Sequence, residues 1–550
     1  MWSQVYNPLG NATLSTCAAA LPAVVLLGAL GILRMRAHMA ALVGVATSLV
    51  VAVLIFGMPG GLAARATAYG VAYGLFPIGW IILNVIFLYR LTNERGLFGV
   101  LRHSVTRVTS DRRLQLLLVA FCLGAFFEGA AGFGTPVAVT AAILIGLGFP
   151  PLEASGLSLI ANTAPVAFGA LGTPLIALQS VTGLDLLKLS AMTGRELTVF
   201  SVIVPFWLIS VFAGWRGMIG IWPALLVAGI SFAIPQWLIS AYHGPWLVDV
   251  VSAVVALGVL TFFLTRWQPR EIWRHAGRRP STAPPVPAAV DDEAPDSRQL
   301  FRAWLPWIIL TVLVFVWGIP QVKAWLDGLS APRFTIEGLD NLILRMPPVV
   351  TDPRPEAAVF VLNWLSATGS GILVAAIIGG LVMGYRPAAL VREYWRTIVQ
   401  VRYSLLTIAA MMAVGYITRY AGLDATMGLA FAQTGRLYPI FATLLGWLGV
   451  ALTGSDTSSN VLFGSLQRIT AEQLGLSPTL MASANSAGGV MGKMIDAQSI
   501  VVASTATEWY GHEGDILRYV FLHSLGLALL MGLFIFLQAY VYPFTLMVIQ

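Results

Sequence analysis

Four charged residues lie in or directly after glycine-rich and polar interruptions of long apolar stretches, where membrane-buried helices are predicted: Glu128, Asp456, Lys493 and Asp496. A charged side chain near the centre of a bilayer costs roughly 2.5–3.5 kcal/mol on insertion scales, and such residues usually mark ion or substrate pathways. The densest polar group is GSDTSSN, residues 454–460, which follows the apolar run FATLLGWLGVALT and precedes VLFGSL. These residues are therefore the first candidates for chemistry.

Lys493 is the candidate anchor for a small anion. A carboxylate that leaves water needs a cation, or the N–H groups at a helix N-terminus, to replace its hydration. The alternative is structural, with Lys493 neutralising Asp456 or Glu128. Asp496 follows Lys493 by three residues, and this spacing places both side chains on one helix face and predicts a local ion pair.

Glu128 and Asp456 are the candidate proton carriers. Burial favours the protonated form of a carboxyl and a nearby ammonium favours the ionised form, so an occupied site can decide whether the proton is held. The alternative is an inert helix cap or ion pair. The SDTSSN stretch has two further interpretations. Its oxygen atoms suit a Na⁺ cage, and its small residues also permit a tight turn at a helix break.

Hydroxyl and amide side chains near these charges are expected to contact a bound substrate. They are Asn162, Thr163, Ser455, Thr457, Ser458, Asn485 and Ser486. The six histidines show no HExxH pattern and no pair at ligand spacing, so no metal site and no cofactor are predicted. Both cysteines lie in apolar segments, which indicates small buried side chains and no disulfide. No GxxxxGK[ST] loop is present, so ATP does not supply the energy.

The elements that must position these residues are membrane helices. Of the 550 residues, 57% are hydrophobic and only 10% are charged, whereas soluble domains have about 25% charged residues. The sequence therefore predicts an all-α polytopic membrane protein. Full spans are expected at about 14–33, 39–57, 68–89, 153–181, 196–214, 219–241, 246–265, 303–320, 359–384, 403–420, 478–507 and 517–543. Two further apolar runs, 114–149 and 428–470, are interrupted by glycine and polar residues and predict hairpins or broken helices.

Residues 266–302 divide the chain into two halves, 1–265 and 303–550. This segment contains a basic block, the run STAPPVPAAV and the acidic patch DDEAPD, which is typical of a flexible hydrophilic linker. With both termini outside, 21 of the 32 Lys and Arg residues fall on the inner side, 10 fall outside and Lys493 lies within the membrane. This bias places the linker in the cytoplasm and points to membrane orientation rather than to a nucleic-acid partner.

The two interrupted regions resemble each other. Each has LG-x-x-x-x-G, about 30 residues, and then N-x-A-x-x-x-x-G, which ends at Gly169 in the first half and at Gly492 in the second. In the expected topology the first hairpin starts inside and the second starts outside, so the copies are inverted. Inverted repeats with glycine-interrupted helices are the best sequence pointer to a transporter binding site.

At these motifs the sequence resembles the bacterial L-lactate permease family. The matching stretches are WSQVYNPLGN (2–11), FEGAAGFGTPVAVTAA (127–142), NTAPVAFGALGTP (162–174), GWRG (214–217), RMPPVV (345–350), GWLGVALTGSDTSSN (446–460), GGVMGKM (488–494) and QAYV (538–541). The resemblance covers nearly the whole chain. It implies a symporter of the bacterial cytoplasmic membrane for lactate and protons that often also accepts glycolate. The residues alone predict only a transporter of a small anion with proton coupling.

One departure from the family pattern concerns the candidate site. After GGVxGKM the family pattern is ISPQS, whereas this chain has IDAQS, so Asp496 adds a negative charge beside Lys493. Three other classes remain open. A symporter for another small carboxylate or one driven by Na⁺ fits the same residues. A membrane-embedded enzyme would need a nucleophile–base set, which does not appear in the sequence. A passive channel would not accumulate substrate against a gradient.

Overall fold

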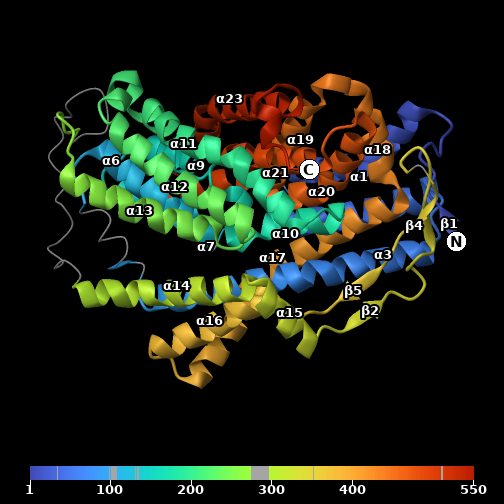
Figure 1. Ribbon diagram of the computed structural model, residues 1–550, viewed down its shortest axis with the longest axis horizontal. Helices are drawn as coiled ribbons and strands as arrows, with labels where there is room; N and C mark the ends of the chain where they lie inside the picture. Colours follow the sequence, from blue (N-terminus) through green and yellow to red (C-terminus); the bar gives the residue numbers. More distant parts are fainter. Residues whose placement is uncertain are drawn as a thin grey trace.

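The computed structural model describes residues 1–31, 33, 35–97, 99–100, 108–130, 132, 135–273, 296–350, 352–509 and 512–549. Most of the predicted linker therefore lies outside the described residues, and so do three residues of the FEGAAGFG motif. The described part is dominated by helices, as the apolar composition predicts. Figure 1 shows the long helices running side by side along the molecule.

The first half contains the following helices: α1 (Ala12–Gly31), α2 (Ala37–Val50), η1 (Val51–Ile55), α3 (Gly60–Tyr73), η2 (Gly74–Gly79), α4 (Trp80–Glu94), α6 (Arg112–Leu116), η3 (Leu117–Leu123), α7 (Gly124–Ala130), α8 (Thr135–Gly146), α9 (Pro151–Ala161), η4 (Val166–Phe168), α10 (Gly169–Thr182), α11 (Leu186–Ile219), α12 (Trp222–Tyr242) and α13 (Val248–Arg266).

The second half contains these helices: α14 (Ser297–Gly318), α15 (Pro320–Leu329), α16 (Thr368–Val382), α17 (Pro387–Ala421), α18 (Leu423–Phe431), η5 (Ala432–Leu437), α19 (Tyr438–Thr453), α20 (Asp456–Leu474), α21 (Pro478–Gly492), η6 (Lys493–Ile495), α22 (Ala497–Ala506), α23 (Glu513–Tyr540) and η7 (Phe544–Met547). Five short strands complete the described elements: β1 (Trp2–Ser3), β2 (Arg333–Thr335), β3 (Ile343–Arg345), β4 (Arg354–Pro355) and β5 (Val359–Val361).

Nine helices in the described part of the chain are long and apolar enough to cross a membrane, or ten if the bent pair α9–α10 is one span. The chain is therefore a multi-pass membrane protein, although this count does not reach the expected twelve. The spans expected at 153–181 and 478–507 as continuous helices are both broken. The first bends by 64° between residues 161 and 166, and the second is interrupted at residues 493–496.

Each half therefore contains two broken helices rather than one. In the first half the breaks separate α7 from α8 and α9 from α10; in the second they separate α19 from α20 and α21 from α22. The breaks within a half lie against each other. A Cβ on Gly132 would approach the Ala170 Cβ to 3.3 Å, and one on Gly454 would approach Asp496 Oδ1 to 3.0 Å. Both glycines have positive φ, which few other residues adopt without cost.

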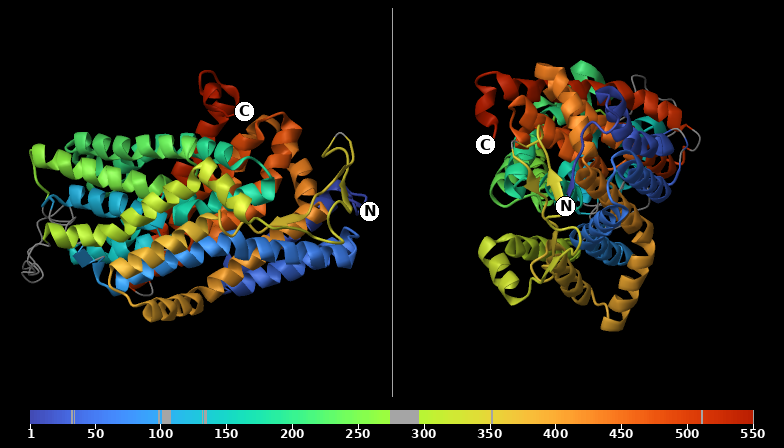
Figure 2. Two further views of the ribbon diagram at one scale, coloured as in Figure 1. Left: turned by 60° about the horizontal axis from the view of Figure 1, so that its bottom comes forward. Right: turned by 90° about the vertical axis from the view of Figure 1, so that its right-hand side faces the viewer.

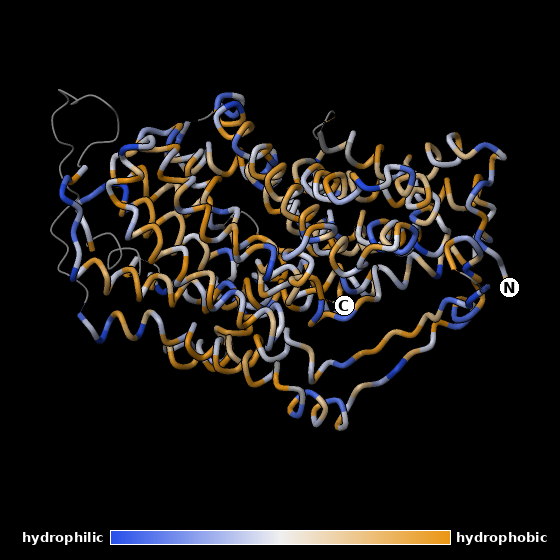
Figure 3. Tube along the Cα trace, turned by 45° about the horizontal axis from the view of Figure 1, so that its top comes forward, coloured by the Kyte–Doolittle hydropathy of each residue, from blue (hydrophilic) through white to orange (hydrophobic). Residues whose placement is uncertain are grey.

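Polar segments gather at the two ends of the long helices. Figures 1 and 2 show the strands and the N-terminus at one end, while the end of α13 and the start of α14 lie at the other. Figure 3 shows hydrophobic residues along most of the helix lengths and hydrophilic residues mainly towards these ends. Strand β3 pairs with β1 in parallel and with β4 antiparallel, and β2 pairs antiparallel with β5.

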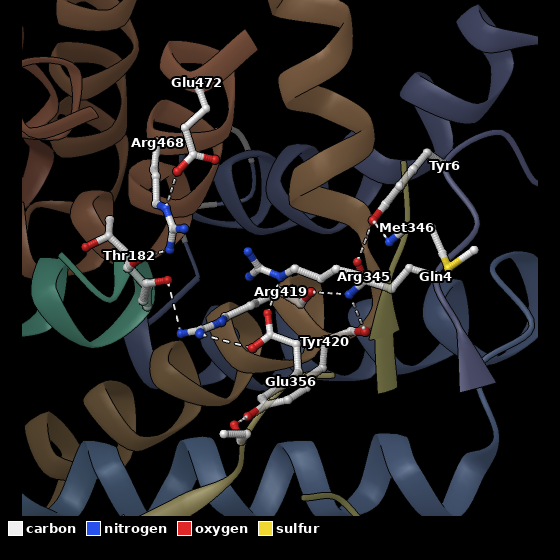
Figure 4. Close-up of polar contacts among 12 residues, drawn as sticks. Gln4, Tyr6, Thr182, Arg345, Met346, Glu356, Arg419, Tyr420, Arg468 and Glu472 are labelled. Carbon is white, nitrogen blue, oxygen red and sulfur yellow. Dashed lines mark hydrogen bonds and ion pairs between the residues drawn. The ribbon is translucent and has the colours of Figure 1, made fainter. Parts of the chain in front are cut away.

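At the end of the molecule that carries the strands, an ion cluster fixes the strands to the helices (Figure 4). Glu356 pairs with Arg345 and, at 3.3 Å, with Nη2 of Arg419 in α17. Arg419 also donates to the last carbonyls of α10, at 3.2 Å to Ser180 and 3.3 Å to Val181. Cations at a helix C-terminus satisfy its free carbonyls and oppose its dipole. The cluster therefore fixes the C-terminal end of α10.

Stability is predicted to depend on pH through Glu356. Burial alone would raise its pKa, but the charges of Arg419 and Arg345 outweigh burial and hold the pKa below the ordinary value. The carboxylate therefore stabilises the fold above the unfolded pKa of about 4.3, and this contribution is lost as the pH falls through the lowered folded pKa. Glu356→Gln should cost roughly 3–5 kcal/mol at neutral pH, because it leaves two largely buried arginines without a counter-charge.

The check is the thermal unfolding midpoint of the purified protein at pH 7 and in steps below pH 4.5. The difference between wild type and Glu356→Gln should shrink on the acid side. Glu472→Gln is the control, because its partner Arg468 is 26% exposed and Glu472 is 34% exposed, and such a pair contributes about 1 kcal/mol or less. A difference that is constant with pH would contradict the assigned charge role.

Candidate functional site

A cavity of about 210 Å³ lies where the helix breaks of both halves meet. Its walls include Glu128 and the start of α10 from the first half, and residues 453–458 and Lys493 from the second. Part of α17 around Tyr403 to Ile408 closes one side. A water molecule needs only about 10–15 Å³ of such space, so the cavity can hold a small anion together with water.

Glu128 lies in the last turn of α7 and is 4% exposed. Its Oε2 accepts a hydrogen bond from Asn162 Nδ2 at 3.0 Å. The carboxyl lies directly against the backbone of the neighbouring break, because a Cβ on Gly169 would come within 2.5 Å of Oε1. Glycine at 169 therefore leaves the space that the carboxyl occupies between the two breaks.

Asp456 is the first residue of α20 and is 3% exposed. Its Oδ2 accepts hydrogen bonds from Ser486 Oγ at 2.5 Å and from Asn460 Nδ2 at 3.2 Å. Its Oδ1 is buried and has no hydrogen-bond partner among the residues that the structure describes. A Cβ on Gly489 would approach Oδ1 to 2.2 Å, so glycine is needed there too. One oxygen of this carboxyl is thus held and the other is left without a donor.

Lys493 joins the two breaks of the second half. Its Nζ donates to the carbonyl oxygen of Gly454 at 2.7 Å and lies 3.2 Å from Asp496 Oδ2. Asp496 also caps α22, since its Oδ1 accepts from the Ser499 N–H at 2.7 Å. Lys493 is 5% exposed and Asp496 is fully buried. The ammonium is therefore compensated locally and still forms part of the cavity wall.

Two helix N-termini meet at the cavity. The first turn of α20 lines it with Ser455 to Ser458. Ala170 to Gly172 at the start of α10 have left-handed backbone angles, and Thr173 and Pro174, where the helical conformation begins, line the cavity. Ser455 is the N-cap of α20, and its hydroxyl accepts from the Ser458 N–H at 3.3 Å. Each N-terminus contributes about half a positive charge. The arrangement suits an anionic group, because the N-termini of half-helices at membrane depth favour negative charge.

The ionisable groups at the cavity do not balance. Glu128, Asp456 and Asp496 provide three carboxyls, whereas Lys493 is the one ammonium in the described wall. With all four ionised the net charge would be −2, and an anion would be repelled despite the helix dipoles. Protons bound to these carboxyls would reduce that repulsion.

The expected binding residues fall into two groups. Ser455, Thr457 and Ser458 line the cavity together with Lys493. Asn162, Thr163, Asn485 and Ser486 are buried but are not part of its wall. Asn162 and Ser486 instead donate to the two carboxyls, Glu128 and Asp456, at the distances given above.

Asn485 belongs to a buried chain of polar side chains behind the cavity. Tyr438 donates to Gln467 at 2.6 Å, Gln467 donates to Asn485 Oδ1 at 3.1 Å, and Asn485 donates to Asn460 Oδ1 at 3.0 Å. Asn460 then donates to Asp456. The helices α19 and α21 that carry part of this chain cross very closely, since a Cβ on Gly446 would lie 1.9 Å from the Asn485 carbonyl oxygen.

Sequence reasoning missed several residues at or near the cavity. Thr173, Thr407, His38 and Tyr403 contribute to its wall, and the last two stack at a ring distance of 4.7 Å. The apolar runs that contain or adjoin these four residues show no pattern that marks them as part of a site. Asp249 is different: it is 1% exposed and packs against Gly129 beside Glu128, and neither of its oxygens has a hydrogen-bond partner in the described part of the chain. Its position inside the predicted span 246–265 was a usable signal.

The described residues contain no group of three or more His, Cys, Asp or Glu side chains arranged to hold a metal ion.

Comparison with known proteins gives one family. The family profile described as "L-lactate permease" matches residues 15–542. The glycolate permease GlcA of Escherichia coli K12 is 44% identical over 560 residues, which cover 98% of each chain. The L-lactate permease of Salmonella typhimurium LT2 is 44% identical over 555 residues and also covers 98% of each chain. The solved Alcanivorax borkumensis YdaH transporter aligns with 87% of this chain and 86% of its own at 14% identity, with a TM-score of 0.43, too low to support any argument.

Substitutions in the cavity wall and substitutions behind the wall are predicted to differ in their effect on stability. Asn485→Ala should destabilise the protein by about 1–3 kcal/mol, because Gln467 and Asn460 then lose buried partners. Thr457→Ala, which removes a hydroxyl from the cavity wall, should leave stability nearly unchanged. The thermal unfolding midpoints of both variants in one detergent provide the check. Equal midpoints would show that the chain behind the cavity does not stabilise the fold.

Proposed function

The chain belongs to the L-lactate permease family, and on this basis we propose that it takes up L-lactate and glycolate by proton symport. A relative named for each substrate is 44% identical over 98% of the chain, so the identities favour neither. Both substrates are small 2-hydroxy monocarboxylates, which suits a cavity of about 210 Å³ lined by an ammonium and hydroxyl groups.

The observation that supports proton coupling is the excess of carboxyl groups around the cavity. A bound substrate anion adds a further negative charge beside Glu128 and Asp456, and this raises the free energy of their ionised forms. Binding of the anion and binding of protons then favour each other by the same free energy, as linkage requires. Symport follows if the cavity opens to the other side of the membrane only when the anion and the proton are both bound or both absent.

Each wall residue has a role in this proposal. Lys493 and the N-termini of α10 and α20 hold the substrate carboxylate. The hydroxyls of Ser455, Thr457 and Ser458 hold the 2-hydroxyl group. Glu128 and Asp456 carry the proton.

The residues outside the wall act through these groups. Asn162 and Ser486 orient the two carboxyls that they contact, while Thr163 and Asn485 support the breaks from behind. Asp496 keeps Lys493 in place through the ion pair.

We further propose that the chain consists of two inverted repeats, 1–265 and 303–550, joined by a cytoplasmic linker at 266–302. The paired breaks in each half support this organisation. About twelve full spans are proposed, seven of them before the linker, with the interrupted run 114–149 entering and leaving the membrane on one side. Both termini then lie outside the bacterial inner membrane. Movement of one repeat against the other would expose the cavity to each side in turn.

The test is uptake of labelled L-lactate and glycolate by the purified protein in liposomes with an imposed pH gradient. Accumulation should require an acidic exterior and should collapse with a protonophore, with or without Na⁺. Uptake that survives the protonophore but requires Na⁺ would overturn proton coupling. Absence of uptake of either acid would overturn the substrate assignment.

Charge-neutral variants separate coupling from binding. Glu128→Gln and Asp456→Asn should reduce accumulation at least tenfold and reduce substrate exchange across the membrane by less than threefold. Lys493→Ala should abolish both, because the substrate carboxylate loses its cation. Membrane levels and unfolding midpoints serve as controls for folding. Equal loss of accumulation and exchange in the Glu128 and Asp456 variants would assign these residues to binding or to structure instead.

A further inference from the structure

A second cavity, of about 400 Å³, lies towards the strand-bearing end of the molecule. Its wall includes Tyr69 and Tyr73 of α3, Gln179 of α10, Tyr416 of α17 and Val359 of β5. It shares α10 and α17 with the central cavity, which is lined by residues up to Pro174 of α10 and Ile408 of α17. The two cavities are therefore consecutive along the same pair of helices.

The wall of the second cavity carries positive charge. Arg419 and Lys323 both line it, and no Asp or Glu is among its described wall residues. Lys323 makes no ion pair within the described part of the chain, and its Nζ lies 5.7 Å from the centre of the Trp246 ring. Glu356 approaches Arg419 from the strands but is itself shared with Arg345. The cavity thus has an excess of cations, opposite to the carboxyl-rich central site.

A tight helix contact lies against α17 at a level between the two cavities. A Cβ on Gly70 of α3 would lie 2.6 Å from the Met412 carbonyl oxygen, and one on Gly74 would lie 2.7 Å from the Ala409 Cα. Backbone therefore touches backbone between α3 and α17. Along α17 this contact falls between Ile408 of the central cavity and Tyr416 of the second cavity. At 1.5 Å per residue the separation along the helix is about 12 Å.

We propose that the second cavity is an outer vestibule with a binding subsite for the substrate carboxylate, where Lys323 and Arg419 receive the anion before the α3–α17 contact opens. This rests on the proposed function and its orientation, in which the strands face outwards. Positive charge in a cleft raises the local concentration of an anion and its rate of association. The higher local concentration of the anion in the vestibule would offset its electrostatic repulsion by the carboxyls of the central site.

Lys323 offers the cleaner test, because Arg419 also fixes the end of α10. Lys323→Gln should raise the half-saturation concentration for uptake from the strand side about threefold, with the maximal rate unchanged. Lys323→Arg should restore the wild-type value. Arg333→Gln removes one charge from an exposed strand at the same end and should have no effect. Transport in the opposite direction, measured with the linker side facing the substrate, should keep its half-saturation concentration in all three variants.

Two results would overturn the vestibule: an unchanged half-saturation concentration in Lys323→Gln, or an equal change in both directions. A transport-independent probe separates this failure from failure of the proposed function. In a Cys17→Ser background, Asn363→Cys places a thiol on the vestibule wall. Each reagent's rate is divided by its rate with a free thiol in solution. By this measure an anionic thiosulfonate should modify the thiol several times faster than a cationic one, and Lys323→Gln should reduce that preference. Equal normalised rates would exclude an attractive potential for anions, whatever the substrate.

Discussion

The contacts of Lys493 hold together the part of the structure on which the rest depends. One ammonium group reaches the carbonyl at the break between α19 and α20 and the carboxylate that caps α22 after the next break. Backbone polar groups exposed at membrane depth are tolerated only where protein or a water-filled cavity satisfies them. Here the buried ammonium of Lys493 satisfies the carbonyl of Gly454, and the carboxylate of Asp496 neutralises the ammonium. The two breaks are thus held at a fixed separation, and the cavity takes its shape from that separation.

Behind this centre, buried polar side chains connect the helices. The chain from Tyr438 through Gln467, Asn485 and Asn460 to Asp456 connects α19, α20 and α21 by hydrogen bonds in a region without bulk water. Lipid offers little hydrophobic driving force between helices, so close packing and such hydrogen bonds must hold them together. The same chain orients the carboxyl of Asp456 towards the cavity.

The sequence predicted the membrane class, the family and the charged centre, because each depends on local properties. Glu128, Asp456 and Lys493 stood out as charges in apolar surroundings, and the structure gathers them in one wall. The position of Asn485 behind the cavity wall did not follow from the sequence, since a polar residue in the wall and one behind it have similar local sequences. Breaks in the spans 153–181 and 478–507 were missed because their apolar content masks them. Tyr403 and His38 reach the cavity through tertiary packing that no periodicity encodes.

The contact of Gly70 and Gly74 with α17 also bears on how fast the protein can work. Side chains that block a passage can swing aside within picoseconds to nanoseconds, whereas here the backbones of two helices are themselves in contact. Separating two backbones requires displacement of whole helices, a motion on the microsecond to millisecond scale. In the proposed cycle, such a rigid-body movement would be slower than the arrival of the anion. A bulkier residue at either glycine would force the two backbones apart.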